Sequence, residues 1–427
     1  MRSHPYSLGS AGGLPAAEAP ISWYVHLPFC HSKCGYCDFY SLPTQPEWVD
    51  ALTRAIRREI SLRDGGRPVR TIFVGGGTPT VLPADALKQI LAAIPRSPVA
   101  VEFTVEANPS SADELKLDLL RSQGVNRVSF GAQSFFADEL AVLERLHDPS
   151  HVPEAVRLAR RAGFESLNLD LIFGIPGQTL ERFEESLRRA MELEVEHIAC
   201  YSLMYEEGTA LTRRKRQGQI HPADEELELA MFERAIDFLT AAGYEHYETS
   251  NFARPGRRCE HNMVYWRNEE YIGIGPSAVS YENGLRTKNV SDIRRYADAM
   301  LIDEGARSAK GAVPGPVGLP LASAVRDLPG AEERRPLDII AESEHLDADG
   351  AARETAIQML RLSEGIDVAA FGRRFGLDPR TRFADAVAPF IASGHLAADD
   401  RAIRLTRRGM PVANVVMRAF LDREGAP

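Results

Sequence analysis

The sequence predicts an α/β fold, an incomplete (β/α)6 barrel followed by a C-terminal winged-helix-like domain. Six short, apolar, β-branched runs alternate with helical stretches in the first half of the chain. Strands that alternate with helices are typical of βαβ units and a parallel sheet. Beyond about residue 350 the pattern changes to three helices, two short strand-like runs and a last helix. That second pattern predicts a small winged-helix-like module.

The individual elements follow from hydrophobic periodicity. Val49, Leu52, Ile56 and Ile60 recur at spacings of three and four, which marks one face of a helix. Strands are expected at 21–27, 70–76, 100–107, 125–131, 166–174 and 197–203. Further helices are expected at 82–94, 111–122, 152–162, 179–193 and 224–242.

Shifts in composition suggest four segments. Residues 1–20 are rich in Gly, Ala, Ser and Pro and are expected to form a flexible tail. The barrel and an aromatic motif occupy 21–295. In 296–345, Gly, Pro, Ala and charged residues dominate, so this segment is expected to be a low-order insertion or linker. The winged-helix-like domain occupies 346–427.

Composition and charge exclude several classes of protein. The 427 residues include 50 Lys+Arg and 60 Asp+Glu, a formal net charge of −10, which argues against a dedicated nucleic-acid-binding protein. No segment approaches the roughly 18 apolar residues that a membrane span needs. The first 20 residues lack the apolar region of a signal peptide, so a cytoplasmic location is expected.

Three of the five cysteines lie close together, directly after the first predicted strand. Cys30, Cys34 and Cys37 form a C-x3-C-x2-C pattern. Three thiolates at this spacing can hold one face of a [4Fe–4S] cube and leave one iron open to another ligand. A zinc site is the alternative, with His26 or His31 as fourth ligand. The spacing and the flanking residues favour the cluster.

The segment from Tyr24 to Phe39, YVHLPFCHSKCGYCDF, resembles the radical S-adenosylmethionine (SAM) family. Within that family it is most similar to the coproporphyrinogen-oxidase-like branch, and there to the HemW-type haem chaperones. The resemblance covers about 21–295 and 350–422. It implies that SAM chelates the open iron through its amino and carboxylate groups. It also implies reductive cleavage of SAM to methionine and a 5′-deoxyadenosyl radical.

The same resemblance assigns SAM contacts to residues near the ends of the predicted strands, where barrel proteins carry their functional groups. The backbone of Gly76, Gly77 and Thr78 is expected to hold the methionine ammonium, and Tyr36 to pack against the adenine. Arg145 is expected on the helix after the fourth strand. Taken singly, each of these residues could be an ordinary surface or salt-bridged group. The remaining contacts assigned by the resemblance are Tyr24, Glu106, Gln133 and Asp170.

Two motifs bear on whether the protein is a chaperone or an enzyme. The oxidases of this branch carry a further Cys two residues after the third, where this chain has Phe39. The string His261-Asn-Met-Val-Tyr-Trp266 matches an H-N-x-x-Y-W feature of the haem-binding members, and imidazole is a good axial ligand for haem iron. The alternative is a packed loop whose His bonds to the backbone. Val279 stands where the family commonly has His, which departs from the pattern.

The sequence therefore predicts a haem chaperone that binds haem and delivers it to an acceptor protein. A [4Fe–4S] cluster and SAM are the expected cofactors, no nucleic-acid partner is expected, and peripheral membrane association is compatible with the role. One alternative is an oxygen-independent coproporphyrinogen III oxidase, which removes carbon dioxide from two propionates. A redox-sensing regulator that binds DNA through the winged-helix-like domain is another.

Overall fold

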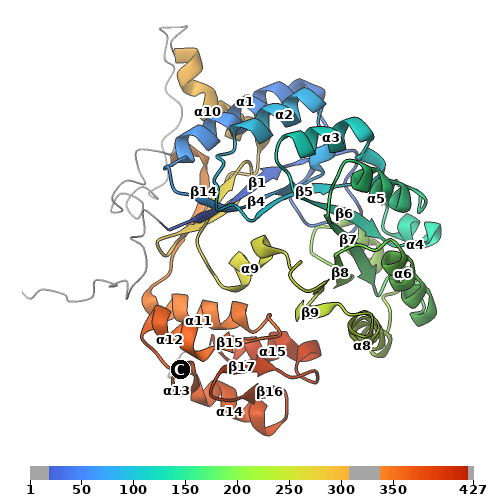
Figure 1. The fold of residues 1–427 in the computed structure, drawn as a ribbon, viewed down its shortest axis with the longest axis vertical. Helices are drawn as coiled ribbons and strands as arrows, with labels where there is room; N and C mark the ends of the chain where they lie inside the picture. Colours follow the sequence, from blue (N-terminus) through green and yellow to red (C-terminus); the bar gives the residue numbers. More distant parts are fainter. Residues whose placement is uncertain (1–18, 307–336, 422–427) are drawn as a thin grey trace, which may run out of the picture.

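The computed structural model describes residues 19–306 and 337–421. One twelve-stranded sheet dominates the structure, in the linear order β14-β13-β12-β11-β1-β4-β5-β6-β7-β8-β10-β9. Helices cover its convex face, and the C-terminal part of the chain lies on the concave side (Figure 1). The expected N-terminal tail, apart from its last two residues, lies outside the described residues.

The centre of the sheet confirms the predicted partial barrel. Its six parallel strands are β1 (Ile21–Leu27), β4 (Val69–Gly76), β5 (Glu102–Ala107), β6 (Arg127–Gln133), β7 (Ser166–Phe173) and β8 (His197–Ser202). The connecting helices are α1 (Pro46–Arg63), α2 (Ala84–Ala93), α3 (Glu114–Ser122), α4 (Ala137–Val142), α5 (His151–Arg161) and α6 (Leu180–Glu192). After β8 come α7 (Ala210–Arg216) and α8 (Glu225–Ala241).

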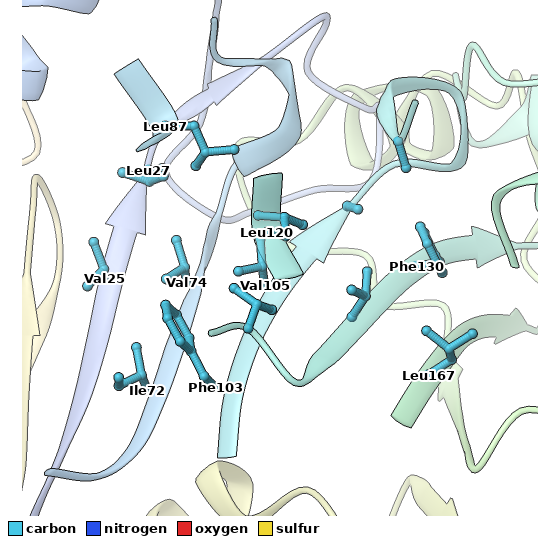
Figure 2. Packing of buried hydrophobic residues seen from close by; sticks show 14 of the residues in the cluster. Val25, Leu27, Ile72, Val74, Leu87, Phe103, Val105, Leu120, Phe130 and Leu167 are labelled. Atoms are coloured by element: carbon cyan, nitrogen blue, oxygen red, sulfur yellow. The ribbon is translucent and has the colours of Figure 1, made fainter. Parts of the chain in front are cut away.

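The main core lies between this sheet and its outer helices. Val25, Val74 and Val105, from three neighbouring strands, are fully buried. Leu87 of α2 and Leu120 of α3 belong to the same cluster, and Figure 2 shows them with the strand residues. Removing this apolar surface from water contributes about 2 kcal/mol per side chain of this size. Along strands such as β7, core residues alternate with polar residues on the opposite face of the sheet.

The sheet continues beyond the six predicted strands. On one side β11 (Tyr271–Ile274) pairs parallel with β1, and an antiparallel extension follows. That extension consists of β12 (Val279–Glu282), β13 (Leu285–Asn289) and β14 (Ile340–His345). On the other side lie β10 (Asn251–Ala253) and β9 (Glu245–Glu248), both antiparallel to their neighbours.

The prediction of low order over 296–345 is wrong at both ends of that segment. Helix α10 (Ile293–Ala306) packs against α1, and β14 adds an edge strand to the sheet. β14 carries mostly exposed polar residues, so it lacks the apolar run that would reveal it in the sequence. The middle of the segment, 307–336, lies outside the described residues.

The C-terminal part has a winged-helix-like order of one helix, one strand, three helices and two strands. After α11 (Ala348–Met359) and β15 (Ile366–Asp367), α12 (Val368–Phe375), the short α13 (Pro379–Arg382) and α14 (Ala384–Ala392) lead to the hairpin. The elements that complete the module are β16 (Leu396–Ala398), β17 (Ala402–Leu405) and α15 (Ala413–Arg418). A separate hydrophobic cluster that includes Phe371, Phe383 and Phe420 forms its core. The predicted winged-helix-like domain is confirmed.

The short helix α9 (Glu260–Trp266) lies within the curve of the sheet, against β4 and α11 (Figure 1). Arg374 of α12 donates hydrogen bonds to the carbonyl oxygens of Arg267 (2.7 Å) and Asn268 (2.6 Å), just after α9. The Asn268 amide also donates to Thr355 Oγ1 at 3.1 Å. The C-terminal domain therefore holds α9 in place. Among the described residues, no helix is both long and apolar enough to cross a bilayer.

Candidate functional site

A cavity of about 610 Å³ opens at the carboxyl ends of the parallel strands. This is the edge at which barrel folds place their chemistry. Two of the predicted site residues, Tyr24 and His261, do not line the cavity. The structure brings the others together on its wall: Cys30, Cys34, Tyr36, Cys37, Gly76, Gly77, Thr78, Glu106, Gln133, Arg145 and Asp170.

The cysteine loop connects the short strands β2 (Phe29–Cys30) and β3 (Leu42–Pro43). All three of its thiols are free and partly buried. Burial raises the pKa of Cys37 to about 11 and also raises the pKa of Cys30. A bound iron cluster would supply the positive charge that favours the thiolates. Thr78 Oγ1 lies 3.6 Å from Cys30 Sγ and is a hydrogen-bond donor to that sulfur.

His26 is unavailable as the fourth ligand of a zinc site. Its Nε2 donates to the Tyr40 carbonyl oxygen at 2.8 Å, so Nδ1 accepts from the Tyr24 hydroxyl at 3.0 Å. Burial lowers the pKa of His26 to about 4. Tyr24 is therefore tied to a structural histidine of the same strand, which explains why it does not reach the cavity.

The glycine loop after β4 packs too tightly for side chains. Gly76 has φ +103°, and a Cβ there would lie 2.4 Å from the His26 ring. A Cβ on Gly77 would lie 2.5 Å from the Phe29 carbonyl oxygen. Only glycine tolerates both the left-handed conformation and this close approach. The loop therefore presents backbone groups to the cavity, as a small polar ligand such as an ammonium group requires.

Two carboxyl groups face the interior of the cavity. Burial raises the pKa of Glu106 to about 8, and the neighbouring Asp170 reinforces the shift. The Gly76 N–H donates to Glu106 Oε2 at 3.2 Å. Burial raises the pKa of Asp170 to about 6, although a 2.8 Å hydrogen bond from Asn168 favours the ionised form. Such perturbed acids in a cleft are typical of binding and catalytic sites.

Arg145 lies in the loop after α4, so the prediction that it is helical is wrong. Helix α4 ends at Val142 because the chain turns at Glu144, which has φ +56°. Arg145 donates to the Gly131 carbonyl oxygen at 2.5 Å, and its Nη1 lies 3.6 Å from Cys34 Sγ. Its buried Nε has no hydrogen-bond partner within the described part of the chain. A guanidinium placed in this way beside the thiols suits a carboxylate ligand.

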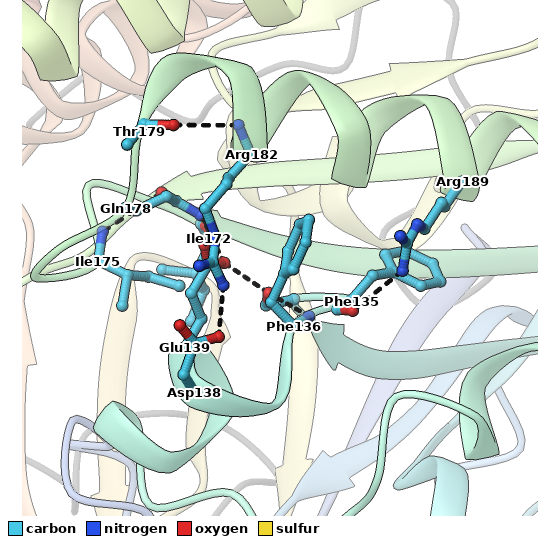
Figure 3. Close-up of polar contacts among 11 residues, drawn as sticks. Phe135, Phe136, Asp138, Glu139, Ile172, Ile175, Gln178, Thr179, Arg182 and Arg189 are labelled. Atoms are coloured by element: carbon cyan, nitrogen blue, oxygen red, sulfur yellow. Dashed lines mark hydrogen bonds and ion pairs between the residues drawn. The ribbon is translucent and has the colours of Figure 1, made fainter.

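Gln133 ends β6 in a left-handed conformation (φ +65°), where the register with β7 shifts. A buried polar cluster holds the following turn (Figure 3). In it, Glu139 accepts hydrogen bonds from Ser134 Oγ (2.5 Å), Gln178 Nε2 (3.0 Å) and Arg182 Nε (2.9 Å). These contacts join the loops after β6 and β7 and so support the strained backbone at Gln133.

The cavity floor contains polar residues that the sequence analysis missed. His197 Nδ1 donates to Asn168 Oδ1 at 2.6 Å, and His197 Nε2 accepts from the Tyr247 hydroxyl at 2.8 Å. Asn168 in turn donates to Asp170. Arg127 and Asn251 also line the floor. The sequence does carry a signal for these residues. Arg127, Asn168 and His197 are polar residues that lie within, or at the start of, predicted apolar strands.

The structure does not present His261 to the cavity. The side chain is fully buried, with Nδ1 2.8 Å from Thr71 Oγ1 and Nε2 2.9 Å from the Tyr265 hydroxyl. Its ring stacks on Phe73 with 5.3 Å between centroids, and burial lowers its pKa to about 3. Both ring nitrogens are engaged, so the expected axial ligation of haem is not available in this arrangement. Its neighbour Asn262 lines the cavity instead.

Comparison with known proteins places this site in a class. The Radical SAM superfamily matches residues 24–190, and the HemN C-terminal domain matches residues 346–412. The cysteine loop, the glycine loop and the open α/β sheet are thus those of a radical SAM protein. A solved structure of coproporphyrinogen III oxidase (HemN) from Escherichia coli has the same fold. Its TM-score is 0.75 at 24% identity, over 95% of this chain and 90% of that one.

More similar relatives are heme chaperones named HemW. The Bacillus subtilis protein is 33% identical over 407 residues, 94% of this chain and 99% of the relative. The Mycobacterium tuberculosis protein is 33% identical over 99% of both chains. The Escherichia coli protein is 38% identical over 66% of this chain and 77% of the relative. The chain belongs to the HemW family of radical SAM proteins, and this membership implies a [4Fe–4S] cluster and SAM as cofactors.

Proposed function

We propose that this protein binds haem and transfers it to an acceptor protein, with a [4Fe–4S] cluster and SAM held in the cavity. The observation that carries this proposal is the similarity, over nearly the full length, to proteins named heme chaperones. The similarity to the oxidase is lower, at 24% identity, and concerns the fold alone.

In this proposal, Cys30, Cys34 and Cys37 bind the cluster. When bound, the cluster supplies the electron that reductively cleaves SAM. Arg145 pairs with the SAM carboxylate, and the backbone at Gly76 lies against its amino group. Three observations support this assignment: the free thiols on the cavity wall, the loop that admits no Cβ, and the Arg145 Nε that lacks a hydrogen-bond partner among the described residues.

The apolar surface of the cavity suits a flat, largely apolar ligand. Phe39 is 66% exposed and Met204 is 60% exposed, and both line the cavity. Tyr201, near the end of β8, adds an aromatic ring to the lining of the same cavity. Large apolar side chains that remain exposed around a pocket commonly mark a binding surface. Phe39 also stands where the oxidases of this branch carry a Cys. The proposal does not depend on His261, which holds α9 against β4.

The experiment compares haem binding with oxidase activity in the same preparation. The anaerobically reconstituted protein is incubated with SAM, a reductant and coproporphyrinogen III, and mass spectrometry follows the loss of carbon dioxide. Haem is titrated in parallel and followed by its absorbance. We expect intact porphyrinogen and saturable haem binding. Repeated decarboxylation of porphyrinogen would instead establish the oxidase function.

A further inference from the structure

The cavity floor contains a buried cation that has no role in the proposed SAM site. Arg127, the first residue of β6, is only 4% exposed and lines the cavity. Its nearest hydrogen-bond partner is Thr104 Oγ1, at 3.5 Å from Nη1, which is the outer limit for such a bond. Its Nε has no partner in the described residues, where Arg127 also forms no ion pair. A buried guanidinium is costly unless an anion pairs with it.

The nearby carboxylates are already engaged elsewhere. Glu102 accepts hydrogen bonds from Thr104 Oγ1 (2.9 Å) and from the backbone N–H of Glu260 (2.7 Å). Cys259 Sγ, at 3.3 Å, is a further donor to the same carboxylate. Glu102 therefore caps the start of α9. Asp170 accepts from Asn168. Both acids influence Arg127 only through longer-range attraction, so its donors remain available to a ligand.

Apart from Arg127 and Asp170, the floor residues named above are uncharged. His197 is fully buried, and burial lowers its pKa well below the ordinary value, so its imidazole is uncharged. Asn168 and Asn251 are amides. Arg127 also borders a second cavity at the opposite edge of the sheet, where Arg121 lies. Arg127 thus places a positive charge between two cavities, on the floor of the one that holds the candidate site.

We propose that Arg127 binds a propionate carboxylate of the tetrapyrrole that the protein carries. The proposal rests on the proposed function for the identity of the ligand, because haem carries two propionates. Guanidinium and carboxylate form paired, charge-assisted hydrogen bonds, and neither Glu102 nor Asp170 forms such bonds with Arg127 in the described residues. The lining residues Phe39, Tyr201 and Met204 would contact the macrocycle. Arg127 would then select tetrapyrroles with a free carboxylate.

The test compares Arg127→Met with the wild-type protein, both full-length and reconstituted. Affinities are measured for haem, haem dimethyl ester and coproporphyrin III in one buffer. We expect Arg127→Met to weaken haem binding by about 10- to 100-fold, the usual effect of losing a hydrogen bond to a charged group. The ester, which lacks the carboxylates, should bind both proteins equally. Arg127→Lys, which keeps the charge but loses the planar fork, should recover part of the affinity.

Two controls separate binding from folding. The ligand-free Arg127→Met protein should melt no lower than the wild type, because the substitution removes an unpaired buried charge. Arg121→Met removes an arginine that lines only the second cavity and should leave haem affinity unchanged. A lower melting temperature together with equal losses for haem and ester would make Arg127 a structural residue and overturn the proposal.

The ligand series also separates this inference from the proposed function. If the wild type binds haem and Arg127→Met binds it equally well, the carboxylate subsite is wrong and the haem chaperone stands. If the wild type binds coproporphyrin III but not haem, and Arg127→Met loses that binding while Arg121→Met keeps it, the carboxylate subsite stands. The proposed haem chaperone function is then wrong.

Discussion

The proposed SAM site makes a quantitative prediction at Glu106. Burial raises the pKa of its carboxyl group to about 8, with Asp170 contributing. If the ionised Glu106 carboxylate accepts hydrogen bonds from SAM, Glu106 must lose its proton before SAM binds. SAM affinity should therefore increase with pH. Ligand-free stability should change in the opposite direction, because a raised carboxyl pKa contributes stability below the unfolded pKa that is lost as pH rises through about 8.

The size of the effect follows from the pKa. The apparent Kd scales with 1 + 10^(pKa − pH), which falls from ~33 at pH 6.5 to ~1.3 at pH 8.5 for a pKa of about 8. Affinity should thus rise roughly 25-fold across this range, which corresponds to about 1.9 kcal/mol. Glu106→Gln removes the titrating group, so its SAM affinity should vary much less with pH. At pH 8.5 the variant should bind about 10-fold more weakly.

The assay is equilibrium dialysis of SAM against the anaerobically reconstituted proteins. The ratio of wild-type to Glu106→Gln affinity at each pH cancels the titration of SAM itself. Asp170→Asn should keep the pH dependence but shift its midpoint to lower pH, because Asp170 helps to raise the pKa of Glu106. A ratio that stays constant from pH 6.5 to 8.5 would refute the assignment of Glu106 as a charged SAM contact.

Three further substitutions test other parts of the structure. Cys34→Ala should lose the iron and its broad brown absorbance after reconstitution, whereas Cys200→Ala, a buried thiol in β8, should keep both. Gly76→Ala should destabilise the fold by about 2–4 kcal/mol in denaturant unfolding, owing to the His26 clash and φ +103°. The control is Gly66→Ala, at a position with φ +75° where an added Cβ would meet no other atom. It should lower the free energy of unfolding by about 1 kcal/mol. Arg374→Ala should lower the free energy of unfolding by about 1–2 kcal/mol, because it releases the end of α9. An equal loss of stability in Arg373→Ala, at an exposed neighbouring position, would contradict that role.

The parallel part of the fold was predictable because short strand segments rich in buried apolar residues alternate regularly with helical stretches. The edge strand β14 was not, since most of its side chains are exposed and polar. The position of His261 could not be predicted either. Its motif fits a haem ligand, but the structure turns the ring toward Thr71 and Phe73. That orientation depends on how α9 packs between the sheet and the C-terminal domain, which no local pattern encodes.

The part of the site at the carboxyl ends of the strands was predictable, because parallel strands commonly place functional groups there. Cys30, Glu106 and Gln133 follow that rule and line the cavity. The floor was missed, although its polar residues carry a signal. Arg127 and His197 begin their strands, where a polar residue is usually a boundary. Arg127 lies two residues before Ser129, and His197 lies four residues before Tyr201. Strand alternation therefore places each pair on the face that lines the cavity.

The most direct test of the central claim is a haem titration of the reconstituted, SAM-loaded full-length protein. A difference spectrum should saturate at one haem per chain, and the loaded protein should pass haem to an acceptor apoprotein faster than free haem equilibrates. Absorbance that rises linearly without saturation, with no transfer, would contradict the account of this protein as a haem chaperone.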